Sequence, residues 1–125
     1  MANWTSDELT KIEGADELRL ASLRSDGTLR KPVTMWVVRD GNDLYVRSMH
    51  GPDGAWYRGT QTRSAGHIRA GGVDKDVRFV VDTDPTLNDR IDAAYRSKYR
   101  RYGDNIIGSV VNPAARESTI RVVPQ

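Results

Sequence analysis

The sequence predicts a mainly β protein: one antiparallel sheet of six strands, curled into a barrel or a sandwich, with three inserted helices. Short segments with alternating apolar and polar residues recur along the chain, and most are joined by turns rich in Gly, Asp and Asn. Such short turns join antiparallel neighbours, and a single sheet that buries alternate residues usually closes on itself. Helical segments are too few to supply the crossovers of a parallel sheet.

The length and composition indicate one small domain. With 125 residues, the chain is expected to fold as a single unit over residues 1–125. Cysteine is absent, which excludes disulfides, thiolate metal ligands and a thiol nucleophile. The N-terminal segment is polar, and no apolar run is long enough to span a membrane, so we expect a cytoplasmic protein. Arginines number 15 against 4 lysines, and the planar guanidinium suits phosphate and carboxylate groups.

The first half of the chain predicts one helix followed by three strands. Thr5 and Glu8 form a capping-box pattern, which predicts a short helix that ends at Gly14. The next three segments alternate in polarity or are rich in β-branched and aromatic residues. They predict strands over Glu17–Arg24, Pro32–Arg39 and Leu44–Met49.

The second half predicts two further helices and three further strands. The helical segments are Ala55–Arg63 and Thr86–Tyr102, the second with apolar residues near helical spacing and Gly103 as its stop. The segment Asn105–Val111 is apolar and fits either a helix or a strand, and Asn112-Pro113 is expected to be a loop. The predicted strands are Gly66–Ala70, Val73–Thr83 and Ser118–Val123.

The candidate binding segment runs from Leu44 to Gly59, where a strand, a glycine-rich turn and a helix start follow one another. Arg47 and Ser48 end the strand, and the turn contains Gly51, whose backbone can approach a ligand closely. Free N–H groups at a helix start favour phosphate, and aromatic side chains can stack on a ring. The helix opens with three residues of these kinds, Trp56, Tyr57 and Arg58. Taken singly, each residue also fits a plain structural role.

Two further regions are candidates for the same site. Lys31 and Trp36 lie at the start and in the middle of the second predicted strand, whose pairing with the third would bring them near the glycine turn. The basic, tyrosine-rich segment from Arg96 to Arg101 is able to cover a bound phosphate or to bind RNA. A solvated helix face explains it as well, and the residues are not arranged as an RNA-stacking sheet.

Metal and hydrolytic chemistry find no support in the sequence. The only histidines are His50 and His67, and no paired-histidine spacing or acidic cluster accompanies them. No nucleophile elbow, Walker A motif or dinucleotide-binding glycine motif is present. Redox chemistry carried by a bound cofactor needs no protein nucleophile, so it remains compatible with this chain.

The sequence resembles the flavin-type split β-barrel proteins, especially the deazaflavin-dependent nitroreductase branch and a small uncharacterised bacterial family of that clan. The matching residues are Gly27, Arg30 and Pro32, then Leu44-Tyr45-Val46, Ser48, Gly51, Trp56-Tyr57 and the helix residues Tyr95, Lys98 and Tyr99. The resemblance implies a six-stranded antiparallel split barrel that binds FMN or deazaflavin F420 at the interface of a homodimer. It also implies a reductive activity on a small organic substrate. From the charge and hydropathy patterns we expect no membrane or nucleic-acid partner.

By this resemblance the cofactor contacts are expected to be Arg47, Ser48, Gly51, Trp56, Tyr57 and Arg58, with Lys31 and Trp36 beside them. Tyr45 and His50 are the candidates for a proton donor. The chain departs from the pattern at Gly59, where relatives often have asparagine, and at Met49-His50, where they often have lysine. The alternative is therefore a cofactor-free barrel that binds or transforms a small molecule in the same cavity.

Overall fold

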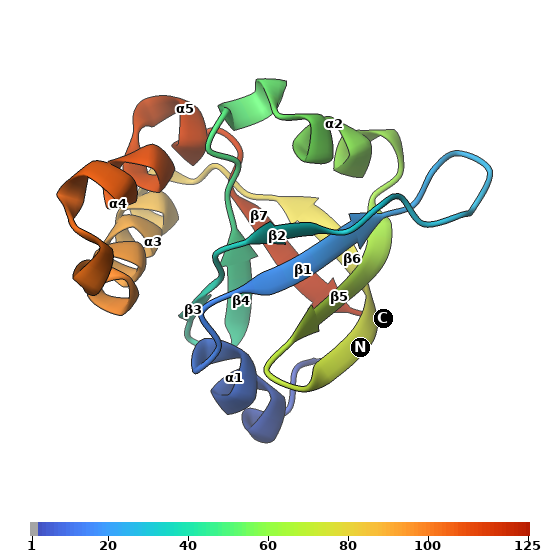
Figure 1. The fold of residues 1–125 in the computed structure, drawn as a ribbon, viewed down its shortest axis with the longest axis horizontal. Helices are drawn as coiled ribbons and strands as arrows, with labels where there is room; N and C mark the ends of the chain where they lie inside the picture. The colour runs from blue at the N-terminus through green and yellow to red at the C-terminus, as the bar shows by residue number, and fades with distance from the viewer. Residues whose placement is uncertain (1–2) are drawn as a thin grey trace.

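The computed structural model describes residues 3–125, which form one curled antiparallel sheet with helices at its ends and along one side (Figure 1). The strand order is β2-β1-β5-β6-β7-β4-β3. The strands are β1 Leu18–Ser22, β2 Val33–Met35, β3 Val38–Asp40, β4 Asp43–Val46, β5 Ala65–Ala70, β6 Val73–Val81 and β7 Ile120–Pro124. The helices are α1 Ser6–Glu13, η1 Gly51–Asp53, α2 Ala55–Thr62, α3 Pro85–Lys98, η2 Arg100–Tyr102, α4 Asp104–Val111 and α5 Pro113–Arg116.

The described chain has seven strands, which corrects the expected six. The segment Pro32–Arg39, expected to be one strand, is divided into β2 and β3, and the two pieces pair with different neighbours. Because β2 and β3 are the two edges of the sheet and only Trp36 and Val37 join them, the edges must lie close together. The sheet is therefore nearly closed, and we call the gap between its two edges the seam.

Helix α3 supplies the hydrogen bonds that Val37 loses by leaving the sheet. The Val37 N–H donates to the Tyr99 hydroxyl at 3.1 Å, and the Lys98 ammonium donates to the Val37 carbonyl at 2.7 Å. The Tyr99 hydroxyl in turn donates to the Asp16 carbonyl at 2.7 Å. A buried peptide group without such partners would cost the free energy of a lost hydrogen bond. These side chains therefore make the break in the predicted strand tolerable.

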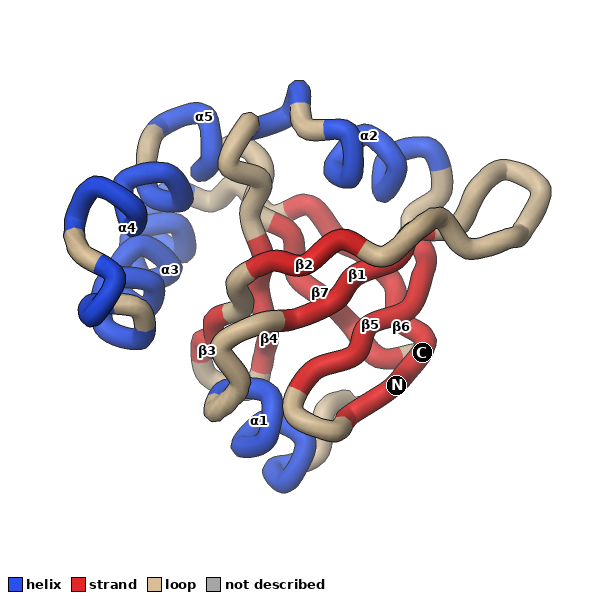
Figure 2. The backbone as a smooth tube through the Cα atoms, viewed as in Figure 1, coloured by secondary structure: helices blue, strands red, loops and turns tan. Residues whose placement is uncertain are grey.

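Two apolar clusters hold the molecule together. The first fills the inside of the curled sheet, with α1 at one end and α2 at the other (Figures 1 and 2). The second lies between the outer side of β3 and β4 and the helices α3 and α4, and it is built around Tyr95 and Tyr99. The helices α3, α4 and α5 thus form a layer against one side of the barrel (Figure 1).

The predicted helices are present, and the C-terminal region contains more helix than expected. The capping box of Thr5 and Glu8 is formed at the start of α1. The ambiguous segment Asn105–Val111 lies in α4. Asn112, expected in a loop, caps α5 by accepting from the Ala115 N–H at 2.9 Å. Within residues 3–125, no helix has the length and apolar character needed to cross a bilayer.

Candidate functional site

A cavity of about 370 Å³ lies at the seam, where the outer edge of β2 meets the segment that follows β4. We call it the seam cavity. Its walls come from five parts of the chain: the residue before β1, strand β2 with the seam, the segment after β4, the start of α2, and α4. The lining residues are Glu17, Val33, Thr34, Met35, Trp36, Ser48, Met49, His50, Trp56, Ile106, Ser109 and Val110.

Two tryptophans form flat walls of this cavity. Trp36 stacks on Tyr99 with ring centroids 3.9 Å apart and planes within 4° of each other, so helix α3 fixes its orientation. Trp56 contacts the ring of Tyr57 edge-on at 6.3 Å. The two neighbours serve different regions, because Trp56 lines the cavity while Tyr57 is buried in the barrel core. A planar ligand would find rigid aromatic surfaces here.

The polar corner of the cavity is built by Ser48, His50 and the turn after them. The His50 N–H donates to the Ser48 hydroxyl at 3.2 Å, and the Ser48 N–H donates to the Ser118 hydroxyl at 2.8 Å. Gly51 follows with φ of +62°, and a Cβ there would lie 2.7 Å from the Ala114 carbonyl oxygen. Only glycine fits both constraints. Gly51 therefore shapes the turn, although its own atoms do not line the cavity.

The charge of the lining does not suit a phosphate. Among residues 3–125, Glu17 is the one acidic residue that lines the cavity and His50 is the one histidine, and neither Lys nor Arg borders it. A phosphate inside would face a carboxylate without a cationic partner. The cavity therefore suits an apolar or aromatic group, and a charged tail would have to extend beyond its walls.

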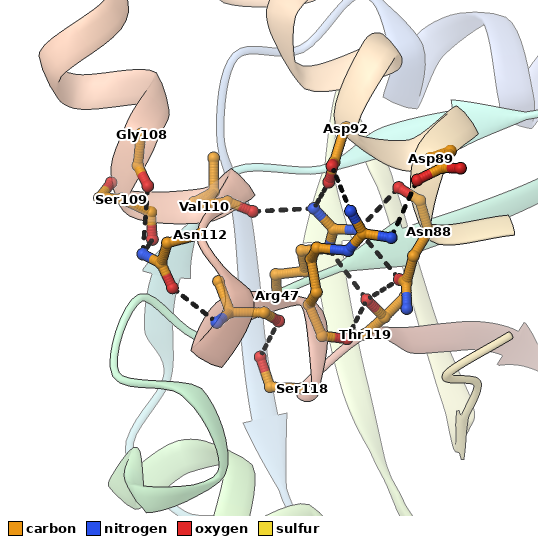
Figure 3. A network of polar contacts seen from close by, with 12 residues as sticks. Arg47, Asn88, Asp89, Asp92, Gly108, Ser109, Val110, Asn112, Ser118 and Thr119 are labelled. Carbon is orange, nitrogen blue, oxygen red and sulfur yellow. Dashed lines mark hydrogen bonds and ion pairs between the residues drawn. The ribbon is translucent and has the colours of Figure 1, made fainter. Parts of the chain in front are cut away.

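Arg47 lies outside the cavity, at the centre of a buried polar network (Figure 3). All five of its N–H groups are used inside the protein. Nε donates to the Thr119 hydroxyl at 2.9 Å, and the two terminal nitrogens donate to the Asp92 carboxylate, the Val110 carbonyl, and both the carbonyl and the side-chain oxygen of Asn88. The Asp92 contact, at 2.5 Å, is an ion pair between side chains that are 0% and 8% exposed.

This placement corrects the expectation that Arg47 binds a phosphate, because none of its donors is left for a ligand. Asp92 also accepts from Arg116 at 3.1 Å, so the network connects β4 and β7 with α3, α4 and α5. Its bond to the Val110 carbonyl, at 2.9 Å, holds the α4 wall of the seam cavity. Arg47 therefore holds one wall of the cavity in place without lining the cavity itself.

The other candidates divide between the cavity, the core and the surface. Ser48, Trp36, Trp56 and His50 line the cavity. Tyr45 is buried in the second apolar cluster, on the helix side of β4, where burial raises its pKa to about 12. This position corrects the expectation that Tyr45 serves the cavity as a proton donor. The side chains of Lys31 and Arg58 are exposed and make no hydrogen bond or ion pair with residues 3–125.

Sequence reasoning missed the contribution of α4 to the cavity. Ile106, Ser109 and Val110 line it from a segment whose secondary structure was ambiguous. The available signal was the apolar spacing of Ile107 and Val110, which are the two buried residues of α4. Nothing in that spacing indicated that α4 would lie beside β2, because the two are more than 60 residues apart in the chain.

The sequence matches one protein-family model over most of its length. A family model described as "Uncharacterized protein conserved in bacteria (DUF2255)" matches residues 8–122. The chain belongs to this family. The match confirms the resemblance to a bacterial family of the split-barrel clan. Among curated proteins, none matches the sequence.

Solved structures with the same fold include proteins that are described as an F420 reductase and as FAD-binding. An F420 reductase is 22% identical with a TM-score of 0.59, covering 93% of this chain and 91% of that one. A FAD-binding protein from Mesorhizobium loti is 17% identical with a TM-score of 0.61, covering 98% and 91%. A Listeria innocua protein, provisionally assigned as a pyridoxamine 5′-phosphate oxidase, is 16% identical with a TM-score of 0.65, covering 94% and 90%. At these identities the likeness shows the split-barrel fold alone.

Proposed function

We propose that the protein binds the ring system of a flavin or deazaflavin, FMN or F420, in the seam cavity and acts as an oxidoreductase on a small organic substrate. The observation that carries the proposal is the cavity itself, about 370 Å³ in volume and walled by Trp36 and Trp56. This volume lies in the range of small-molecule sites. The fold shared with an F420 reductase and a FAD-binding protein adds support.

The residues present fit the ring part of such a cofactor. Trp36 is held flat by its stack on Tyr99, and Met35 and Val110 add apolar surface around it. Ser48 and His50 place polar atoms at one corner, where the edge of a ring carries its hydrogen-bonding groups. Most of the wall is apolar, which favours exclusion of water from a reacting ring.

A bound flavin or deazaflavin would supply hydride transfer, for which the protein needs no nucleophile. The chain would orient the ring, exclude water and supply a proton. His50 is the proton donor that we propose, because it is the one histidine that lines the cavity. Tyr45 lies in the other apolar cluster and does not share this role.

The phosphate of such a cofactor would lie outside the cavity, because the lining contains no Lys or Arg. Arg58 and Lys31 are the expected phosphate contacts that remain after Arg47 is assigned to the buried network. Both side chains are exposed and free of partners within the described chain. Gly51 and Tyr57 would act indirectly, the first by shaping the turn and the second by anchoring α2 in the core.

A second function is favoured by the same lining. A cavity without a cation beside it also suits an uncharged apolar molecule bound without any cofactor. In that case the protein would bind or transform a small molecule directly in the seam cavity. Binding of riboflavin, which has the flavin ring but no phosphate, would be compatible with both functions. A purified protein that is coloured by a bound flavin would support the cofactor-dependent function.

We also propose a cytoplasmic homodimer in which a second copy covers the mouth of the cavity. Three apolar side chains at the cavity wall are strongly exposed: Val33 at 39%, Met49 at 57% and Ile106 at 50%. Exposed apolar groups that gather at one place are typical of interaction surfaces. Sedimentation of the wild type and of the Met49→Gln, Ile106→Gln double variant would test this. The dimer of the variant should be weaker, so monomers should already appear at protein concentrations where the wild type is still dimeric.

The main experiment is an absorption spectrum of the purified protein, followed by separate titrations with FMN, F420 and riboflavin. Trp36→Leu and Trp56→Leu should each weaken binding of all three. Loss of an aromatic contact corresponds to about 0.5–1.5 kcal/mol beyond the lost burial. Arg58→Gln should weaken FMN while leaving riboflavin unchanged, by about 1.5–3 kcal/mol for a lost charge-assisted contact.

Arg100→Gln is the matched control, since Arg100 is exposed and does not line the cavity. It removes the same charge as Arg58→Gln and should leave all three affinities unchanged. A colourless protein that binds none of the three ligands would exclude the oxidoreductase and leave the cofactor-free function. Binding that persists in both tryptophan variants would show that the ring lies elsewhere.

A further inference from the structure

A second concave region lies on the outer face of β1 and β5, outside the barrel. We call it the outer cleft; its volume is about 300 Å³. Arg19 and Arg69 are direct partners across the two strands, and Ala21 and His67 are the next such pair on the same face. The alternate residues of both strands point into the barrel core. The loop that joins β1 to β2 forms the remaining wall.

The pairing of Arg19 with Arg69 is unfavourable by itself, because like charges directly opposite each other destabilise a sheet. Arg69 is compensated by Asp74, which accepts from its Nε at 3.0 Å and from a terminal nitrogen at 2.9 Å. The Arg19 side chain makes no hydrogen bond or ion pair with any residue from 3 to 125. One positive charge of the pair therefore remains without a counter-charge.

Arg30 brings a second unpaired guanidinium to the cleft. The backbone N–H of Arg30 donates to the Ser22 carbonyl at 2.9 Å, which fixes the loop against the end of β1. Its Nε is buried and has no hydrogen-bond partner in the described chain. A Cβ at position 59 would lie 3.1 Å from this Nε and 3.3 Å from the adjoining carbon, so Gly59 leaves the space that the side chain occupies. A buried donor without a partner is costly unless something accepts from it.

The remaining charges around the cleft leave it positive. His67 lies between Asp76 and Asp74, and its pKa is raised, mainly by the hydrogen bond with Asp76. Neither carboxylate lines the cleft, whereas all three arginines do. Even with His67 neutral, the three arginines exceed the two aspartates. The excess is one positive charge with His67 neutral and two with His67 protonated. The arginines whose side chains have no counter-charge in the described chain are Arg19 and Arg30.

We propose that the outer cleft binds an oxyanion of the phosphate class, held by the guanidinium groups of Arg19 and Arg30. Guanidinium forks match the spacing of phosphate oxygens, and a dianion would offset both unpaired charges. The site does not depend on the proposed flavin function. The phosphate can belong to a free ion or small metabolite, or to a cofactor whose ring fills the seam cavity. Pro32 borders the cleft and Val33, the next residue, lines the cavity.

The test uses inorganic phosphate as the probe, at low ionic strength, with chloride at matched ionic strength as the reference. Amide NMR signals of residues 19–21, 28–31 and 66–69 should shift with phosphate and remain in place with chloride. Arg19→Gln and Arg30→Gln should each weaken phosphate binding at least about tenfold. Arg96→Gln removes an exposed arginine outside the cleft and should change affinity by less than about twofold.

The absence of a phosphate-specific shift would overturn the proposal, and so would equal weakening by Arg96→Gln. Arg30 is partly buried, so Arg30→Gln can also disturb folding. Arg19 is exposed on a strand surface, so Arg19→Gln is the variant that tests the proposal if Arg30→Gln unfolds.

Competition separates the two sources of phosphate. If the cofactor's phosphate occupies the cleft, FMN displaces inorganic phosphate, and Arg19→Gln weakens FMN but not riboflavin. If the anion is free, phosphate binds with unchanged affinity in the presence of saturating FMN. If the protein binds phosphate but no flavin, the anion site in the outer cleft is supported and the proposed oxidoreductase function is excluded.

Discussion

Arg47 stands at the end of β4, and its side chain extends inward beneath α3 and α4 (Figure 3). Its charge is tolerated because Asp92 neutralises it and oxygens from four residues accept its five N–H groups. It also lies over the ring of Tyr95, 5.6 Å from the ring centre. Three of these partners, Asn88, Asp92 and Val110, come from helices α3 and α4. Its role therefore depends on what covers it.

The Arg47–Asp92 pair leads to a stability prediction. Asp92→Asn should lower the free energy of unfolding by about 3–5 kcal/mol, because it leaves a buried guanidinium without a counter-charge. Asp89→Asn is the matched control. Asp89 accepts from Arg116 at 2.9 Å at the surface, and such exposed pairs contribute about 0–1 kcal/mol. Urea unfolding followed by circular dichroism measures both.

The double variant Arg47→Met, Asp92→Leu separates charge from packing. Replacing both partners removes the uncompensated charge, so much of the lost stability should return. Equal effects of Asp92→Asn and Asp89→Asn would contradict the assignment of Arg47 to a structural network.

At the scale of elements, the seam between β2 and β3 depends on the last turn of α3. Tyr99 and Lys98 hydrogen-bond to the Val37 peptide, and the Tyr99 ring carries Trp36. One helix end therefore supplies hydrogen bonds to the Val37 peptide groups and orients Trp36, a wall of the seam cavity. A helix C-terminus also favours a positive charge, which suits Lys98 at this position.

Lys98 leads to a prediction of pH dependence. Burial lowers its pKa from 10.5 to about 8. Between these values the unfolded chain binds more protons than the folded one, so stability should rise with pH across this window. Below about pH 8 the lysine is protonated in both states, and its contribution no longer changes. After allowance for its partial exposure, the rise should be about 1 kcal/mol.

Urea unfolding at intervals from pH 7.5 to about 10 measures this rise. In Lys98→Met the rise should be smaller than in the wild type. Lys31→Met, which removes an exposed lysine outside the helices, should follow the wild-type curve. Parallel curves for all three proteins would show that Lys98 does not titrate as its burial implies.

At the scale of the whole molecule, the centre and the edges of the sheet are held differently. The strands β5, β6 and β7 are paired on both sides, whereas β2 pairs only with β1. Val33 and Thr34 of β2 are exposed, while Val77 and Phe79 of β6 are buried in the first cluster. Local opening should therefore begin at the seam.

Native-state hydrogen exchange should show this order. Amides of β6 should exchange only through global unfolding, and those of β2 through openings that cost several kcal/mol less. A ligand in the seam cavity should slow exchange in β2 and leave β6 nearly unchanged. Equally slow exchange in both strands of the free protein would contradict a seam that opens locally.

Much of the fold was predictable from local patterns. The capping box at Thr5, the alternation in β1, β4 and β6 and the helical spacing of α3 each indicate their element without reference to distant residues. The division of the Pro32–Arg39 strand was not predictable in this way. It depends on Tyr99, more than 60 residues away, and no local signal reports such a partner.

The site was predictable only in part. Ser48, His50, Trp36 and Trp56 do line one cavity, because they lie at the seam or close to the glycine turn. Tyr57 and Arg47 are adjacent in sequence to the cavity-lining residues Trp56 and Ser48, but their side chains point away from the cavity. The direction of a side chain depends on how its element packs. The α4 wall was missed because nothing in its sequence relates it to β2.

By itself the sequence determined a curled antiparallel sheet and the segment from Leu44 to Gly59 as the region of interest, because these follow from local periodicity and turn chemistry. Its resemblance and its match to a family model determined the barrel and the family. Only the tertiary structure decided which side chains remain free for a ligand. It buried Arg47 with Asp92 and turned Trp56 toward the seam cavity. It also left the side chains of Arg19 and Arg30 without hydrogen-bond or ion-pair partners among residues 3–125. The reason is physical: a guanidinium binds whatever acceptors surround it, and folding determines those acceptors.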